Sequence, residues 1–389
     1  MRADDLPQSA FAAGLASLPG AGPAWLVEVL ADHSPGEAWQ MVLSGGLRLR
    51  RGSTAASGGC APGTLLPPEK EEPLRCDLDL DRLWRHCQRL AIQVTWFGHA
   101  SYPPPLTKDP APPGVLFWVG DLAALERPCV AVVGTRRCTP EGARAAYQLA
   151  YDLASAGVCV VSGLAAGIDG AAHAGALAAA QESAGQFGST VGIAASGVDV
   201  AYPPQHRSLY REVARLGAVL SETPPGRPAQ AWRFPSRNRV VAGLARMLVV
   251  VESHAGGGSW HTVEAALQRG IDVGAMPGSI HNPASAGTNT LLHEGAFVVR
   301  SAQDVLDVIA MPVVPAAPVV ATRPGASAVS PPTVGSAAVQ DRPAPPIGKA
   351  PRSGSAPDRA GSARLGETAA SDPYGILDRK VLHALGWRP

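Results

Sequence analysis

The chain has 389 residues, 46% of them hydrophobic, and a formal net charge of +1 at pH 7. This length allows two or three domains. The balanced charge excludes a global attraction to nucleic acid or membranes, so any site for a polyanion must be local. The 43 glycines and 37 prolines predict extensive loops or linkers.

The cysteine pattern and the apolar runs predict a cytoplasmic protein. The six cysteines contain no CxxC pair and have no histidine at zinc-finger spacing, so we expect reduced thiols and no metal site. The N-terminus lacks a basic-then-apolar leader pattern. The longest apolar runs, such as Met247–Val251, have the length of a strand and are too short to span a membrane. We therefore expect no membrane association.

Composition divides the chain into five regions. Residues 1–45 have apolar residues at helical spacing around a Pro/Gly-rich break, which predicts a small helical domain of two short helices. Residues 46–63 are predicted to be flexible, and residues 64–311 to form the main domain. Residues 312–370 are rich in Pro, Ala, Ser and Gly, which predicts a disordered linker. Residues 371–389 regain helical character.

In the main domain, short apolar runs alternate with helical patterns. The predicted strands are Cys129–Gly134, Val158–Ser162, Thr190–Ala195, Ala218–Ser221, Met247–Val251, Val273–Met276 and Ala296–Val299. Helices fill the gaps, for example Pro140–Ser155 and Trp260–Gln268. Continuous apolar strands are typical of a parallel sheet covered on both faces. The expected fold is therefore α/β, a doubly wound and mostly parallel Rossmann-like sheet, in which ligands bind at the carboxyl ends of the strands.

The first strand-to-helix loop carries Gly134, Thr135 and Arg136. A glycine turn, a helix N-terminus and a planar cation together suit a phosphate, although a plain turn with a solvated arginine explains the loop equally well. The loop lacks a GxGxxG pattern, so we expect no dinucleotide cofactor.

The second loop has Ser162, Gly163 and Gly167, which would bring backbone and a hydroxyl close to a phosphate. Asp169 is expected to cap the following helix, which also carries His173.

The segment from Phe234 to Arg239 is the most distinctive. Arg237, Asn238 and Arg239 are predicted to open a helix, so that the helix dipole and two guanidinium groups face the same phosphates. Phe234 offers a flat face for an unpaired base. Residues 203–246 contain eight arginines, no lysine and two acids, which favours an anion site over internal ion pairs.

A glycine-rich loop containing Gly258 and Ser259 is predicted to be another phosphate cradle, without the Gly-Lys-Ser/Thr of a Walker motif. His173 and His261 lie beside glycine loops, but no further ligand follows at metal spacing, so both are interpreted as polar helix residues.

Taken together and in order, these segments resemble the DNA-processing protein A family (DprA, also called Smf), which is associated with bacterial natural transformation. The matching segments are VAVVGTRRCT, SGLAAGIDGAAHAGAL, ASGVDVAYPPQH, LSETPPG, FPSRNRVVAGLA, VVVES, AMPG and GTNTLLHEGA. They run from about Tyr102 to Ile309.

The resemblance implies a protein that binds single-stranded DNA in a basic pocket, forms a homodimer, helps to load the RecA recombinase, and is not an enzyme. Arg136 corresponds to the arginine of the family's Gly-Ser-Arg motif, with Thr135 in place of serine. Phe234, Arg237 and their neighbours correspond to its Phe-Pro-x-Arg-Asn-Arg motif. The N-terminal region is similar to the family's SAM-like or helix-hairpin-helix domain.

The sequence departs from the family at three places. Ala166 replaces a basic residue, which removes one expected phosphate contact. The glycine-rich loop continues as Trp260-His261-Thr262, where the family often has Leu-Ile-Thr. The usual C-terminal winged helix is reduced to Tyr374–Pro389.

Two other classes of function stay open. The glycine-rich loop followed by Glu264 resembles nucleoside-monophosphate phosphoribohydrolases, in which Glu252 or Glu264 would supply acid or base chemistry. A protein-binding adaptor would leave the arginines without a role. For the DNA-binding hypothesis, loss of both Arg237 and Arg239 is expected to weaken binding strongly.

Overall fold

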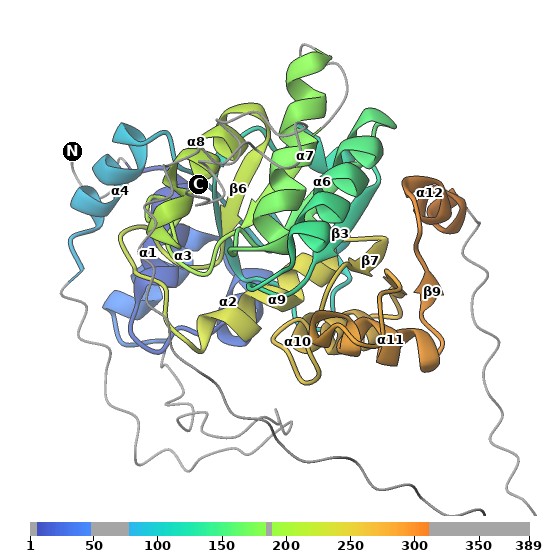
Figure 1. Ribbon diagram of the computed structural model, residues 1–389. Helices are drawn as coiled ribbons and strands as arrows, with labels where there is room; N and C mark the ends of the chain where they lie inside the picture. The colour runs from blue at the N-terminus through green and yellow to red at the C-terminus, as the bar shows by residue number, and fades with distance from the viewer. Residues whose placement is uncertain (1–5, 48–77, 184–188, 311–389) are drawn as a thin grey trace, which may run out of the picture. The chain divides into compact units, whose positions relative to one another are not determined.

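The computed structural model describes residues 6–47, 78–183 and 189–310 (Figure 1). Most of the predicted flexible segment 46–63, the predicted linker 312–370 and the predicted helical remnant 371–389 lie outside the described residues. So do residues 64–77 and 311 of the predicted main domain.

A nine-stranded sheet forms the centre of the described chain. Its strands are β1 (Gln93–Trp96), β2 (Val115–Gly120), β3 (Cys129–Val133), β4 (Cys159–Ser162), β5 (Ser189–Ile193), β6 (Ala218–Ser221), β7 (Met247–Val250), β8 (Asp272–Ala275) and β9 (Phe297–Val298). They are arranged in the order β1-β2-β6-β5-β4-β3-β7-β8-β9. Six of the eight strand pairings are parallel, which confirms the predicted mostly parallel α/β fold.

All seven predicted strands are present, with ends shifted by up to two residues. The prediction missed β1 and β2, which pair antiparallel with each other at one end of the sheet, and β2 also pairs antiparallel with β6. A run of alternating strands and helices identifies parallel crossovers. It gives no signal for a hairpin that precedes the first crossover.

Helices cover both faces of the sheet (Figure 1). They are α1 (Gln8–Ser17), α2 (Pro23–Asp32), α3 (Pro35–Leu43), α4 (Leu80–Arg89), α5 (Pro104–Thr107), α6 (Pro140–Ser155), α7 (Ile168–Glu182), α8 (Arg207–Leu216), α9 (Arg233–Leu244), α10 (Trp260–Leu267), α11 (Ala286–His293) and α12 (Ala302–Ala310). Helices α6, α7 and α12 share one apolar cluster with the strands, while α9, α10 and α11 share the other.

The side chains of β3 alternate between the two faces of the sheet, which shows why helices must cover both faces. Val130 and Val132 belong to the cluster that contains α6 and α7, whereas Ala131 and Val133 belong to the cluster that contains α9. Successive side chains of a strand point to opposite faces, so a strand that is apolar throughout must be covered twice. The last helix of the described chain, α12, packs on the same side, and its Val305 is fully buried in the cluster that contains α6 and α7.

The N-terminal region contains three helices where two were predicted. The predicted break is confirmed as the turn between α1 and α2, in which Gly20 has φ +87°. The additional helix, α3, begins with a capping box in which Ser34 and Glu37 satisfy each other's backbone N–H groups. Helices α1–α4 share a hydrophobic cluster with β1 and β2.

Among the described helices, none is both long and apolar enough to span a bilayer.

Candidate nucleic-acid interface

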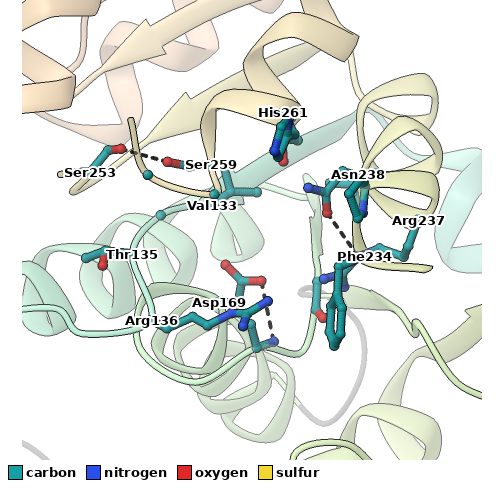
Figure 2. Close-up of a pocket in the computed structure, with 18 of the residues that line it drawn as sticks. Val133, Thr135, Arg136, Asp169, Phe234, Arg237, Asn238, Ser253, Ser259 and His261 are labelled. Carbon is teal, nitrogen blue, oxygen red and sulfur yellow. Dashed lines mark hydrogen bonds between the residues drawn. The ribbon is translucent and has the colours of Figure 1, made fainter. Parts of the chain in front are cut away.

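A cleft of about 840 Å³ opens at the carboxyl ends of the parallel strands. The loops that follow β3, β4 and β7 line it together with the first turns of α9, as the fold class predicts. Figure 2 shows the Arg136 side of the cleft facing the α9 side, with Ser253, Ser259 and His261 on a third wall. The predicted site residues that line it are Gly134, Thr135, Arg136, Gly163, Phe234, Arg237, Asn238, Gly258 and Ser259.

Arg136 and Arg137 are exposed cations that line the cleft, and Arg136 is the one that meets an aromatic ring. The guanidinium carbon of Arg136 lies 4.9 Å from the centre of the Phe234 ring. Among the described residues Arg136 forms no ion pair. The Phe234 ring is also close to the ring of Tyr202, with centroids 5.5 Å apart and planes at 57°. Arginine and aromatic side chains therefore meet at one point in the cleft, an arrangement that suits a phosphate beside a base.

Tyr202 and Arg137 line the cleft but were not assigned to the site from the sequence. Tyr202 is the aromatic one of the two. It is 43% exposed and lines the cleft between β5 and α8. The available signal was its position in the loop after β5, because loops at that edge of a parallel sheet converge.

Arg237 borders the cleft but is largely buried. Only 7% of it is exposed, and its Nη1 donates to the carbonyl oxygens of Gly163 and Ile193. Its Nε donates to the side-chain oxygen of Asn238 over 3.2 Å. A Cβ at Gly163 would lie 2.3 Å from Arg237 Nη1, so this position requires glycine. Arg237 therefore fixes the β4 loop from beneath, and its hydrogen bonds to Gly163 and Ile193 do not favour the expected direct contact with phosphate, which stays a prediction.

The negative charge nearest in effect to Arg237 is Asp169, which is 6% exposed and interacts with it electrostatically. Burial raises the pKa of Asp169 to about 6, although the neighbouring Arg237 and backbone N–H groups act in the opposite direction. Burial likewise lowers the pKa of Arg237 to about 10, so its charge persists at neutral pH. The expected capping role is wrong: Gly167 is the N-cap of α7, and Asp169 lies inside its first turn.

Arg239 faces away from the cleft. Its Nη2 lies 2.5 Å from Oε1 of Glu222, the two side chains are 15% and 17% exposed, and it also donates to the carbonyl of Ala111. Arg239 does not line the cleft, and its pairing with Glu222 does not support the prediction that it neutralises phosphate there. The reason is helical geometry. The motif lies within α9, which begins at Arg233, and positions two apart on a helix point to nearly opposite sides.

A carboxylate of the protein occupies the helix N-terminus that follows Gly134. Glu252 accepts from the backbone N–H of Thr139 over 2.8 Å and from its hydroxyl over 2.6 Å, at the start of α6. A Cβ at Gly142 would lie 2.2 Å from the Glu252 carboxyl carbon. Protein anions at a helix N-terminus satisfy the same N–H groups that a phosphate would use. The expected phosphate position over this helix is therefore filled.

Two further predicted residues have structural roles outside the cleft. Ser162 is fully buried and its hydroxyl donates to the carbonyl of Val132. Gly167 has φ +80°, and a Cβ there would lie 2.4 Å from the carbonyl oxygen of Thr135. It thus allows the β4 and β3 loops to approach each other and supports the loop that carries Arg136.

The glycine-rich loop after β7 forms the remaining wall. The hydroxyls of Ser253 and Ser259 are 2.7 Å apart and both residues are buried. The Thr135 hydroxyl lies 3.2 Å from Nδ1 of His254, which links this wall to the Arg136 loop. No protein atom lies within 4 Å of a Cβ built on Gly258. The loop therefore leaves open space beside Gly258.

The two histidines that lie beside the glycine loops behave differently. His173 is fully buried, its Nδ1 lies 2.7 Å from the Thr190 hydroxyl, and burial lowers its pKa to about 3, so it stays neutral. His261 is exposed and lies 3.6 Å from the Glu264 carboxylate. Within the described ranges, no group of three or more His, Cys, Asp or Glu side chains could hold a metal.

The raised pKa of Asp169 gives a testable dependence of stability on pH. Between its ordinary value of 3.8 and about 6, the folded chain holds this proton more tightly than the unfolded chain. This group therefore lowers the free energy of unfolding as pH rises through that interval, by on the order of 2 kcal/mol. Chemical denaturation of the wild type and of Asp169→Asn across the interval isolates the contribution. If the free energy of unfolding of both proteins changed in parallel with pH, the proposed contribution of Asp169 would be contradicted.

The hydrogen bonds of Glu252 predict a structural role. We expect Glu252→Ala to lower the free energy of unfolding by about 1–3 kcal/mol, because the Thr139 N–H loses its partner. Glu264→Ala is the matched control: this exposed side chain should change stability by less than about 0.5 kcal/mol. Urea denaturation measures both, and equal stabilities would show that the Glu252 contact contributes nothing.

Comparisons with known proteins identify the family of this chain. Residues 93–310 match the family described as DNA recombination-mediator protein A. The chain is 41% identical over 205 residues to the DNA processing protein DprA of Streptococcus pneumoniae, covering 53% of this chain and 70% of that protein. Other curated relatives are matched over 51% to 64% of their length.

Two solved structures share the fold. The X-ray structure of DprA from S. pneumoniae has a TM-score of 0.54 at 37% identity, covering 59% of this chain and 78% of that one. The DprA of Helicobacter pylori, a structure that addresses its single-stranded DNA binding mode, has a TM-score of 0.50 at 27% identity, covering 56% of this chain and 95% of that one. By the extent of its match, this chain belongs to the DNA recombination-mediator protein A family, whose members carry the names DprA and Smf.

Proposed function

We propose that this chain binds single-stranded DNA in the cleft and acts in DNA processing during transformation and recombination. The observation that carries the proposal is the exposed Arg136 guanidinium against the Phe234 ring, beside Tyr202, in an open cleft. The S. pneumoniae relative is named a DNA processing protein, and the H. pylori structure concerns single-stranded DNA binding. These names support the same ligand for this chain.

The charges that line the cleft leave a local excess of cations. Asp169 and Arg237 compensate each other beneath the floor, whereas Arg136 and Arg137 are exposed and form no ion pair within the described part of the chain. Two free guanidinium groups in a concave site attract a phosphate backbone locally, although the net charge of the whole chain is only +1. Ala166, where the family has a basic residue, removes one further contact that other members would have.

The position of Arg136 also suggests how a base enters. Its guanidinium covers one face of the Phe234 ring. When a DNA phosphate draws the guanidinium away from the ring, that face becomes available to an unpaired base, and the exposed ring of Tyr202 provides a second surface. Bases in a duplex are already stacked and paired, so the cleft should favour single strands.

Binding without chemistry is part of the proposal. The alternative, a phosphoribohydrolase, needs a carboxylate that is free for acid or base work. Glu252 is held by two hydrogen bonds from Thr139, which supports a structural role, while Glu264 is exposed beside His261. Incubation with nucleoside monophosphates should release no free base. Release that disappears in Glu264→Gln would favour the enzyme.

The partners of the chain follow from the family resemblance. We propose that it acts in the cytoplasm as a homodimer and that it helps to load RecA onto the bound strand. Sedimentation and co-purification with RecA, with and without single-stranded DNA, test these two contacts.

Loss of the cleft cation should weaken DNA binding in a salt-dependent way. We expect Arg136→Ala to reduce affinity for single-stranded DNA about tenfold and to lower the slope of log K against log salt by about 0.7, the value for one phosphate. The measurement is fluorescence anisotropy at several salt concentrations. Arg211→Ala, which removes an exposed arginine outside the cleft, is the matched control. Equal losses in both variants would mean that the cleft does not bind the strand.

Loss of the aromatic surface should act on base stacking instead. We expect Phe234→Ala to weaken single-strand binding by about 1–3 kcal/mol with an unchanged salt slope, because no charge is lost. Phe234→Tyr keeps the ring and should retain affinity. Competition with duplex DNA should be weak for the wild type, and preferential displacement by duplex would refute the stacking mechanism.

A further inference from the structure

A second cavity, of about 550 Å³, lies on the other side of the first turns of α9. Its walls are the turn between α1 and α2 (residues 16–23), part of the loop after β6, and the α9 side chains of Arg233 and Ser236. Arg237 borders both cavities, and residues 229–231 line the first while Trp232 lines the second. The start of α9 is therefore a thin partition between two open sites.

The second cavity has cations that the fold does not neutralise. Glu222, the acid among its lining residues, is paired with Arg239 at 2.5 Å. Arg227 is exposed and Arg233 is half-buried, and neither forms an ion pair with any residue that the structure describes. Burial, and after it the nearby charge of Arg227, lowers the pKa of Arg233. Two cations held close together without a carboxylate favour an added anion.

An exposed indole lies beside these cations. Trp232 is 64% exposed, and the guanidinium carbon of Arg233 lies 4.9 Å from its ring centre. Its Nε1 donates to the side chain of Gln230 over 2.9 Å, which helps to hold the ring in place. The exposed face of this ring is a flat surface on which an unpaired base can stack. The pair repeats the chemistry of Arg136 and Phe234 on the opposite side of the partition.

We infer that a single strand held in the first cleft continues across Trp232 into the second cavity, where Arg227 and Arg233 bind its phosphates and Trp232 stacks one of its bases. This inference rests on the proposed function and extends it by a second set of contacts. The first cleft and the second cavity adjoin at α9, both are open, and each presents an arginine against an aromatic ring. Successive nucleotides present a phosphate and an unpaired base in the same alternation.

The test compares two lengths of oligothymidylate. An oligomer of about 4 nucleotides should fill only the first cleft, whereas one of about 16 should reach both, a range typical of single-strand sites. We expect Trp232→Ala to weaken binding of the long oligomer about tenfold and to leave the short one within about twofold. Trp232→Phe should restore most of the loss. Arg227→Ala/Arg233→Ala should also lower the salt slope for the long oligomer by about 1.4, twice the value for one phosphate.

Controls separate this inference from the proposed function. Arg207→Ala/Arg211→Ala removes two exposed arginines of α8 that line neither cavity. It should leave the affinity for both oligomers unchanged. If Arg136→Ala weakens the binding of both oligomers while the Trp232 and Arg227/Arg233 variants weaken the binding of neither, the inference alone fails. If Arg136→Ala changes the binding of neither oligomer, the proposed function itself fails. Equal weakening of both lengths by Trp232→Ala would also overturn the inference, because the second cavity would then not be an extension. If the double arginine variant loses its thermal transition, the Trp232→Ala and Trp232→Phe pair decides.

Discussion

The guanidinium of Arg237 lies at the floor of the cleft, where it connects the loop after β4 with the end of β5. It donates to the carbonyls of Gly163 after β4 and Ile193 at the end of β5, and it lies beside the Asp169 carboxylate at the start of α7. A charge in such a place is tolerated only when it is paired and hydrogen-bonded, because removal of one partner leaves the other buried and unpaired. The shape of the cleft therefore depends on the two carbonyl hydrogen bonds of Arg237 and on the nearby charge of Asp169.

This arrangement divides the arginines of the chain into two groups. Arg237 and Arg239 are both compensated by carboxylates, Asp169 and Glu222, and stabilise the loops and α9. Arg136, by contrast, projects from a loop that Gly167 supports from below and has an aromatic ring as its neighbour. A ring holds a guanidinium without neutralising it, so the cation stays available for a ligand. Among the arginines around the cleft, the poorly exposed ones are thus compensated by carboxylates, whereas Arg136 stays available for binding.

Sequence patterns predicted the fold and the edge of the sheet well, because apolar strands and glycine loops are local signals. Helix α6 has the predicted bounds, and the loops after β3, β4 and β7 converge on one cleft as expected. The roles of individual charges were not predictable in the same way. Glu252 is 113 positions from Thr139, and Glu222 reaches Arg239 only because β6 ends near the side of α9 that faces away from the cleft. The fold decides which carboxylate pairs with which cation. The number of acidic and basic residues in a segment does not predict these pairs.

Helix α9 explains why one motif serves two surfaces. Successive residues of a helix are rotated by about 100°, so the side chains of four consecutive residues cannot share one face. Phe234 and Asn238, four residues apart, face the first cleft, whereas Arg233 and Ser236 face the second cavity and Arg237 lies between them. A basic, aromatic segment placed on a strand or loop could present all its cations to a single ligand site. On a helix that separates two cavities, the same residues must act on both sides, and a ligand that uses both has to pass around the exposed end of the helix, where Trp232 lies.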